Sequence, residues 1–296
     1  MSTNHTLLAA REEQNGEFFI LRNEVEKEMV NYISNLKGKK VYIPNTKRTT
    51  QYAMNDSFVR YFGSTSAIKM YGIKEFSYSY YDENDNFVLI TITPHGITKD
   101  VIDASIDESR LFYVYKQIDN VDVVICNPEG SKFRHIFNYI NVSRKDYILC
   151  TSVMCITYKS VFDSFCKGTV KFGMTVPTTF YSVEENKNKK FGNKIWITSF
   201  DNGYVPKEID TYYDRKSYDY QVFDTNKNIL CVDCVKMIPM DYTGVMGVPA
   251  SFIHLINTDQ FEILGVGNNT RVIGYGCLTF VDNKTKNNRI FIRFRG

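Results

Sequence analysis

The chain has 296 residues, of which 43% are hydrophobic and 15% are aromatic, and its formal net charge is +3. A chain of this length and apolar content can bury a sizeable core in one or two domains. The small net charge excludes a polybasic nucleic-acid binder but not a local basic face. We expect neither a signal peptide nor a membrane span: the N-terminus lacks a basic region followed by an apolar one, and no run of about 18 apolar residues occurs.

The seven cysteines are scattered along the chain, and Cys126, Cys150 and Cys155 lie inside apolar runs. This distribution is typical of buried free thiols in a reducing compartment. Cys231 and Cys234 form the only CxxC pair, and a zinc site would need a second pair of ligands at a suitable spacing. We therefore predict two strand cysteines at this pair and no metal site.

The first part of the chain alternates between helical and strand patterns. Apolar side chains recur at helical spacing over residues 22–33, just after the aromatic stretch 17–20, and predict an amphipathic helix. Residues 41–43 predict the first strand, and residues 58–62 predict another helix. The turn between them, residues 44–55, is long and basic and contains no acid.

A buried strand is predicted in the middle of the chain, after two strands at residues 73–81 and 87–92 that a polar hairpin turn joins. The apolar run 121–126 is rich in β-branched residues and ends in Asn127 and Pro128, a pattern typical of a parallel sheet. Ligands in open α/β sheets bind where such strands end, so both residues are candidate site residues. An ordinary turn is the alternative interpretation.

The second half contains three further patterns. Residues 184–190 predict a charged, flexible loop, and Trp196 on the strand after it is predicted to be a core residue. Two glycines within residues 238–253 indicate close backbone approach or positive φ. In the final strand, residues 289–295, a period of two places three arginines on one face, which indicates either phosphate contacts or a charged edge strand.

Several of these segments, taken in order, resemble the EcoRI-type DNA adenine-N6 methyltransferases. Residues 156–162, Ile-Thr-Tyr-Lys-Ser-Val-Phe, are similar to the family's Ile-Thr-Tyr-Lys-Glu-Val-Phe. Residues 238–249, Ile-Pro-Met-Asp-Tyr-Thr-Gly-Val-Met-Gly-Val-Pro, resemble the family's Ile-Pro-Leu-Asp-Tyr-Asn-Gly-Val-Met-Gly-Val-Pro. The resemblance implies an α/β protein with a Rossmann-like fold for binding S-adenosylmethionine (SAM) and a mostly parallel, twisted sheet. It also implies a methyltransferase-like core over residues 1–180 and C-terminal strands with a DNA-facing region over residues 181–296, packed either separately or as one domain.

The resemblance assigns a catalytic loop to residues 127–130. The family has Asn-Pro-Pro-Phe here: the Asn side chain and the Pro carbonyl accept hydrogen bonds from the target amino group, and the aromatic ring stacks on the flipped adenine. This chain keeps Asn127 and Pro128 but has Glu129 and Gly130 in place of the second Pro and the Phe. The catalytic candidates therefore form a degenerate loop.

The resemblance also assigns a remnant SAM pocket to four residues. Glu17, Phe18 and Phe19 align with the family's Glu-Phe-Tyr-Thr motif, where Phe19 and Ile20 have lost both hydroxyl groups. An aromatic pair that anchors a helix to the core is the alternative interpretation of this motif. Asp103 aligns with the acid that faces the adenine of the cofactor. A helix N-cap followed by acids in the first helical turn is the alternative interpretation of the stretch around Asp103.

Two functions are compatible with these changes. In the first, the chain is a catalytically degenerate relative that serves as a DNA-binding, structural or interaction module, with double-stranded DNA as its partner and a protein partner or a second copy of itself as further candidates. In the second, it is an active SAM-dependent adenine methyltransferase with an atypical Asn-Pro-Glu-Gly loop. The abundance of Asn, Lys, Tyr and Ile is typical of AT-rich bacterial or viral genomes, so we expect the protein in the cytoplasm of a bacterial or host cell, or in a virus particle.

Overall fold

The computed structural model describes residues 18–45, 56–182, 185–213, 219–224, 226–267, 280–282, 284–286 and 288–296. It divides into two compact units that interleave along the chain: unit 1 comprises residues 1–152 and 171–202, and unit 2 comprises residues 153–170 and 203–296. The expected domains, residues 1–180 and 181–296, remain a prediction. No helix in the described residues has the length and apolar character needed to cross a membrane.

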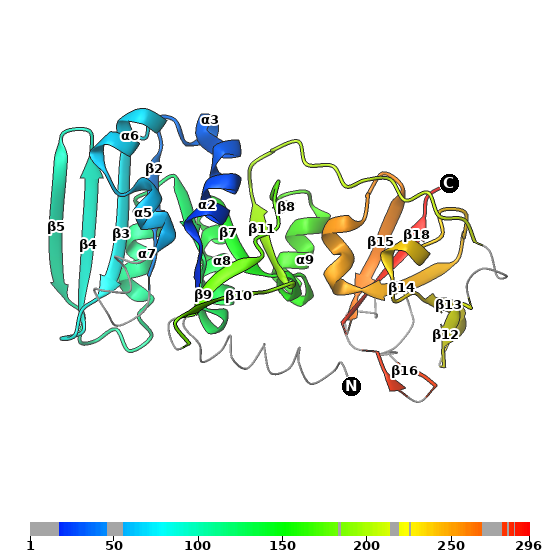
Figure 1. Cartoon of the computed structure of the whole chain (residues 1–296). Coiled ribbons are helices and arrows are strands. Elements are labelled where there is room, and N and C mark those ends of the chain that lie inside the picture. Colours follow the sequence, from blue (N-terminus) through cyan, green and yellow to red (C-terminus); the bar gives the residue numbers. More distant parts are fainter. Residues whose placement is uncertain are drawn as a thin grey trace. The chain divides into compact units, whose positions relative to one another are not determined.

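Unit 1 contains most of the helices and the larger sheet (Figure 1). Its elements in chain order are β1 (Phe18–Ile20), α2 (Arg22–Met29), η1 (Val30–Tyr32), α3 (Ile33–Leu36), β2 (Lys40–Ile43), α5 (Ser57–Phe62), α6 (Thr65–Tyr71), β3 (Glu75–Tyr81), β4 (Asn86–Thr93), β5 (Gly96–Asp103), α7 (Phe112–Asp119), β6 (Val123–Cys126), α8 (Gly130–Val142), β7 (Asp146–Ser152), β8 (Lys171–Phe172), β9 (Thr179–Ser182), β10 (Lys187–Lys190) and β11 (Lys194–Thr198). The predicted loop at residues 184–190 is wrong for its second half, because β10 pairs with β9.

The main sheet has eight strands in the order β5-β4-β3-β2-β6-β7-β11-β8. Only the four central strands β3, β2, β6 and β7 run parallel to one another, while the strands on both flanks pair antiparallel. The α/β architecture is confirmed, but the sheet is mixed, which corrects the expectation of a mostly parallel one. The reason at one flank is local: β3, β4 and β5 follow each other through short turns, and such turns can join only antiparallel strands.

Asp82 forms the first of these turns. Its carboxylate accepts hydrogen bonds from the backbone N–H groups of Asn84 and Asn86, both at 2.9 Å, and Asp85 adopts a positive φ of 58°. Asp and Asn side chains commonly stabilise tight turns in this way. The hairpin predicted from the polar turn is therefore confirmed.

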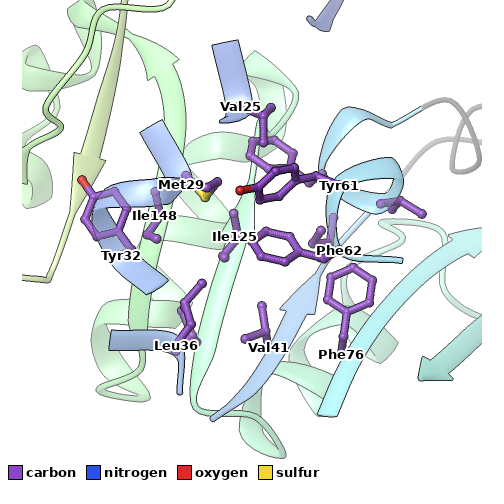
Figure 2. Packing of buried hydrophobic residues seen from close by; sticks show 14 of the residues in the cluster. Val25, Met29, Tyr32, Leu36, Val41, Tyr61, Phe62, Phe76, Ile125 and Ile148 are labelled. Atoms are coloured by element: carbon purple, nitrogen blue, oxygen red, sulfur yellow. The ribbon is translucent and has the colours of Figure 1, made fainter. Parts of the chain in front are cut away.

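Helices cover both faces of the sheet in unit 1. On one face, the predicted amphipathic helix is confirmed as α2, η1 and α3, and with α5 it packs onto the apolar side chains of β2, β6 and β7. Figure 2 shows this cluster around Val25, Met29, Phe62, Ile125 and Ile148. The other face is covered by α7 and α8, since Gln117 of α7 hydrogen-bonds Ser77 and Phe137 of α8 packs against Tyr147. Trp196 is 1% exposed, as expected for a core residue.

Unit 2 is built on a five-stranded sheet with the order β12-β13-β14-β18-β15. Its elements are η2 (Val153–Thr157), α9 (Lys159–Cys166), β12 (Gln221–Phe223), β13 (Asn226–Cys231), η3 (Val235–Met237), β14 (Val245–Pro249), η4 (Ala250–Leu255), β15 (Phe261–Val266), β16 (Phe280–Val281), β17 (Lys284–Thr285) and β18 (Arg289–Phe294). Because β18 pairs with β14 on one side and β15 on the other, the predicted charged edge strand is wrong.

The two glycines of the 238–253 segment lie where the backbone must approach aromatic rings. A Cβ atom on Gly247 would lie 2.6 Å from the ring of Phe223 and 3.2 Å from that of Phe291, and a Cβ atom on Gly244 would overlap the ring of Tyr242. Neither glycine has a positive φ. Of the two predicted explanations, close backbone approach is confirmed.

Candidate functional site

The order of strands in unit 1 reverses at β2. The chain leaves β2 toward β3, β4 and β5 on one side and then returns through α7 to β6 on the other side. In open α/β sheets, such a reversal separates the loops at the carboxyl ends of the two strands and forms the usual ligand site. Here the residues that follow the two strands are Pro44 and Asn45 after β2, and Asn127 and Pro128 after β6.

The loop after β6 contains all four catalytic candidates. Asn127, Pro128 and Glu129 are half-buried, and Gly130 is exposed as the first residue of α8. The backbone carbonyl of Glu129 accepts the N–H group of Phe133 at 2.8 Å and thereby starts the helix. The space beside Gly130 is open, since a Cβ atom built there would have no neighbour within 4 Å.

Asp56, the N-cap of α5, is an acid to which the sequence interpretation assigned no role. Its carboxylate caps α5 by accepting the N–H groups of Phe58 at 2.8 Å and Val59 at 3.2 Å. Burial raises the pKa of Asp56 to about 6, against the lowering effect of these two hydrogen bonds. Burial, followed by the charge of the Asp56 carboxylate, raises the pKa of Cys126 at the end of β6.

The aromatic candidates Phe18 and Phe19 lie on β1, and both are half-buried. Phe18 contacts the ring of Phe191 edge-on, with the centroids 4.9 Å apart. The end of β1 reaches the start of α5, where the Ser57 hydroxyl donates a hydrogen bond of 2.5 Å to the Ile20 carbonyl. Glu17, the remaining residue of the motif, lies outside the described residues.

Asp103 lies at the same edge of the sheet but far from the catalytic loop. It is the last residue of β5, four strands away from β6 in the sheet order, which corresponds to about 19 Å at the usual strand spacing. Its side chain is exposed, and hydrogen bonds from Ser105 lower its pKa. The structure therefore does not bring Asp103 together with Asn127.

A neighbouring acid, Asp107, has a clear structural role. It is 7% exposed, and its carboxylate accepts the Tyr81 hydroxyl at 2.5 Å and the N–H groups of Leu111 at 3.2 Å and Phe112 at 3.0 Å. Burial, followed by this hydrogen bond, raises the pKa of Tyr81. These contacts favour the helix-capping interpretation of the 103–109 stretch, with Asp107 as the residue that serves the start of α7. An acid placed shortly before a helical pattern was the available signal.

The arginines of the final strand bind partners in their own chain. Arg289 is 4% exposed and forms an ion pair with Asp233. Arg293 pairs with Glu262 at 2.6 Å, and the guanidinium of Arg295 donates to the Thr258 carbonyl at 2.9 Å. β18 is buried on both faces over Arg289–Ile292, so its alternation does not produce one exposed basic face.

In the described part of the chain, the other side chains form no metal site. Cys126, Cys150 and Cys155 are buried thiols, as predicted. Within the described ranges, no three His, Cys, Asp or Glu side chains gather closely enough to hold a metal ion. A depression of about 620 Å³ lies against α2, α5 and α6, and none of the predicted site residues lines it.

Helices cover both faces of the sheet in unit 1, its central strands are parallel, and its strand order reverses next to Asn127 and Pro128. These features define the class of α/β proteins whose ligands bind at the carboxyl edge of the sheet. The family model described as adenine-specific methyltransferase EcoRI matches residues 103–292. The chain therefore belongs to the EcoRI-type adenine-specific methyltransferase family.

Three curated relatives are similar over almost their whole length. The type II methyltransferase M.MgeORF184P of Mycoplasma genitalium is 27% identical over 285 residues, which cover 88% of this chain and 86% of the relative. M.EcoRI of Escherichia coli is 26% identical over 300 residues, or 89% of each protein, and M.MpnI of Mycoplasma pneumoniae is 24% identical over 282 residues, or 88% and 85%. No solved structure gives a significant match.

Proposed function

We propose that this chain is a catalytically degenerate member of the EcoRI-type family, built on a Rossmann-like fold and retained as a DNA-binding or interaction module. The strand-order reversal between β2 and β6 and the helices on both faces support the Rossmann-like part of the proposal. The departures from the family pattern fall at positions with chemical roles, while the helices and strands around them pack normally.

One observation at Gly130 carries the proposal. The family has an aromatic residue at this position to stack on the flipped adenine, whereas Gly130 has no side chain and open space beside it. The next aromatic along the chain, Phe133, is 2% exposed and stacks on Phe137 with the ring centroids 5.8 Å apart. Phe133 is therefore occupied in the core, and the loss of one base–aromatic stack forfeits roughly 1–3 kcal/mol.

The charge of the loop supports the same conclusion. Glu129 replaces an apolar proline and puts a half-buried carboxylate next to Asn127, where the phosphates of a duplex would have to approach. Like charges repel more strongly as the surroundings become less polar. DNA bound by this chain would therefore contact a surface away from residues 127–130.

The cofactor candidates do not fit SAM as a set. Asp103 lies four strands from the catalytic loop. On β1, Phe18 matches the phenylalanine of the family's motif, but Phe19 lacks the hydroxyl group of the tyrosine that the family has at that position. The carboxylate of Asp56 already caps two backbone N–H groups of α5. This disagreement supports a loss of methyl transfer.

An active SAM-dependent adenine methyltransferase is the second candidate, and the placement of Asn127 and Pro128 favours it. The pair follows β6 at the strand-order reversal, and the relatives of similar length carry the name type II methyltransferase. In that case SAM would supply the methyl group, the Asn127 side chain and the Pro128 carbonyl would hold the target amine, and Glu129 would accept a further hydrogen bond from it. Exchange of Asn127→Ala would then abolish methylation.

The deciding experiment is SAM binding to the purified chain, measured by calorimetry together with a thermal shift. A site filled at about 100 times its dissociation constant stabilises the protein by roughly 2.7 kcal/mol, which raises Tm by several degrees. No heat and no shift at millimolar SAM support the degenerate module. Clear binding, followed by methylation of adenine-containing duplexes that Asn127→Ala removes, would establish the active enzyme.

DNA binding is tested separately, with a labelled duplex titrated at several salt concentrations. Phosphate contacts release counterions, so the affinity of a true duplex binder falls steeply between about 50 and 200 mM salt. A duplex affinity that does not respond to salt would exclude DNA as the partner and would leave a protein as the partner of the module.

A further inference from the structure

A depression of about 620 Å³ lies at the surface of unit 1, along α2, α5 and α6. On α2 and η1 it is bordered by Arg22, Glu26 and Val30, which are spaced by four residues and therefore lie on one side of the helix. The neighbouring stripe, with Val25 and Met29, is buried in the core. The depression thus follows the seam between α2 and the α5–α6 pair. The lining residues from α5 and α6 include Arg60, Tyr61, Met70 and Tyr71.

The floor of the depression is apolar and is held by the core. Tyr61 is 8% exposed and belongs to the main core cluster, and its ring stacks on that of Tyr71 with the centroids 5.4 Å apart. The rim is apolar as well, since Val30 is 54% exposed and Met70 is 69% exposed. A floor whose side chains are already packed loses little conformational freedom when a ligand binds to it.

The charges around the depression do not balance. Arg22 forms an ion pair of 2.7 Å with Glu26, so these two side chains compensate each other. Arg60 is exposed, and its guanidinium forms no ion pair in the described part of the chain. A guanidinium presents a planar fork of N–H donors that matches the two oxygens of a carboxylate. The depression therefore offers one unused site for a carboxylate beside an apolar floor.

The residue types favour a peptide as the occupant. Tyr, Met and Arg are enriched at protein–protein interfaces, whereas Lys and Asp are depleted there and do not line this depression. Tyr and Arg also dominate the binding energy of many interfaces, and the flexible Met side chain adapts its shape to a partner. A small anion would pair with Arg60 but would leave Val30 and Met70 in water. A peptide can cover the floor and the rim together.

We propose that the depression binds an acidic peptide segment of a partner protein. A Glu or Asp carboxylate of the segment pairs with Arg60, and a neighbouring large apolar side chain packs on Tyr61 and Tyr71 between Val30 and Met70. This surface is separate from the loop at residues 127–130, none of which lines the depression. The proposal does not depend on whether the chain binds SAM or DNA.

Fluorescence anisotropy with the full chain tests the charged part of this contact. The probes are short fluorescein-labelled peptides with blocked ends, in which Glu lies next to Leu or Phe or one helical turn away from it, and a matched set with Lys in place of Glu. The Glu peptides should bind with a Kd below about 100 μM, and the Lys peptides about tenfold more weakly. Arg60→Gln removes the unused guanidinium and should weaken binding of the Glu peptides about tenfold. Arg60→Glu should reverse the preference, so that the Lys peptides bind more tightly.

A second pair of variants tests the apolar part. Met70→Asp places a charge on the rim and should weaken the Glu peptides at least about tenfold, because an apolar side chain can no longer pack there. Val142→Asp, at an 81% exposed valine on α8, is the matched control and should leave the affinity unchanged.

Three results would overturn the proposal. The first is a wild-type chain that binds none of the Glu peptides at about 100 μM. The second is binding that the exchanges at Arg60 and Met70 do not change. The third is self-association in sedimentation velocity that Met70→Asp removes, which would show that a second copy of the chain, and not a partner's peptide, covers the depression.

Discussion

The carboxylate of Glu28 is bound to Thr175 through both the backbone N–H group, at 2.8 Å, and the hydroxyl group, at 2.6 Å. Glu28 is fully buried on α2, and it also accepts the Tyr32 hydroxyl at 2.7 Å and the Met174 N–H group at 2.9 Å. A single side chain thus fixes the segment between β8 and β9 to the first helix of unit 1. Four donors satisfy this buried charge, which would otherwise be very costly to desolvate.

The exchange Glu28→Gln is expected to destabilise the protein. The amide presents N–H donors to a site built only of donors, so at least one hydrogen bond to the 174–175 backbone is lost at a cost of about 2–3 kcal/mol. Urea unfolding measures the change in the free energy of unfolding. Glu26→Gln, on the exposed side of the same helix, is the control and should cost less than about 1 kcal/mol.

The exchange Asp56→Asn should change how stability depends on pH. Burial raises the folded-state pKa of Asp56 from 3.8 to about 6, so the folded state binds the proton more tightly and the wild type loses stability as the pH rises through this window. The asparagine side chain would keep an oxygen that caps α5 but cannot ionise, so the variant should gain about 1–2 kcal/mol relative to wild type between about pH 4 and pH 6. Thermal unfolding at several pH values measures this.

Asp82→Asn provides the contrast for that experiment. Against an opposing effect of burial, hydrogen bonds from Asn86 and Asn84 lower the pKa of Asp82. The ionised Asp82 carboxylate therefore stabilises the folded state above its unfolded-state pKa, and this contribution is lost as the pH falls through its folded-state pKa. Because Asp82→Asn lacks the contribution, this variant should lose stability relative to wild type as the pH rises. If both variants gave the same pH profile, the assignment of the raised pKa to Asp56 would be wrong.

Glycine exchanges should distinguish packing from open space. A Cβ atom on Gly247 meets the rings of Phe223 and Phe291. Because overpacking of this kind typically costs about 1–3 kcal/mol, Gly247→Ala is expected to lower the free energy of unfolding by that amount. Gly130→Ala adds a methyl group where there is room and should be neutral or slightly stabilising, because alanine favours a helix more than glycine does. Denaturant midpoints of the two variants provide the comparison.

Restoring the family loop tests the explanation for the proposed loss of activity. The double exchange Glu129→Pro and Gly130→Phe would remove the carboxylate and add a ring in the open space beside α8. If these two residues alone limit the reaction, the variant should gain SAM-dependent methylation of adenine, which is measured with labelled SAM and a duplex. Continued inactivity together with absent SAM binding would assign the loss to the cofactor pocket rather than to the loop.

The predictions that succeeded were those set by local patterns. The strand ending at Asn127, the amphipathic helix over residues 22–33 and the turn at Asp82 follow from side-chain periodicity and turn chemistry. The mostly parallel sheet that the resemblance implies did not follow, because the predicted β3–β4 hairpin and the adjoining β5 make one flank of the sheet antiparallel. β5 itself was not predicted as a strand.

Charged residues were the least predictable. Arg289 was expected on an exposed face because alternation suggests one polar side, but β18 is a central strand, and Asp233 pairs with this buried guanidinium. Asp56 was given no role from the sequence, because its burial and its raised pKa depend on packing between elements that are distant in sequence. Contacts of this kind depend on tertiary structure and cannot be obtained from spacing.

The interleaving of the two units has a consequence for synthesis on the ribosome. Residues 153–170 supply η2 and α9 to unit 2, where η2 packs against η4 from residues 250–255, while β8 to β11 are still needed to finish the sheet of unit 1. A nascent chain that has reached residue 170 therefore contains incomplete parts of both units. A fragment that begins at residue 203 lacks one of the packing partners of η4, so separate expression of unit 2 requires a permuted gene that joins residues 153–170 to it.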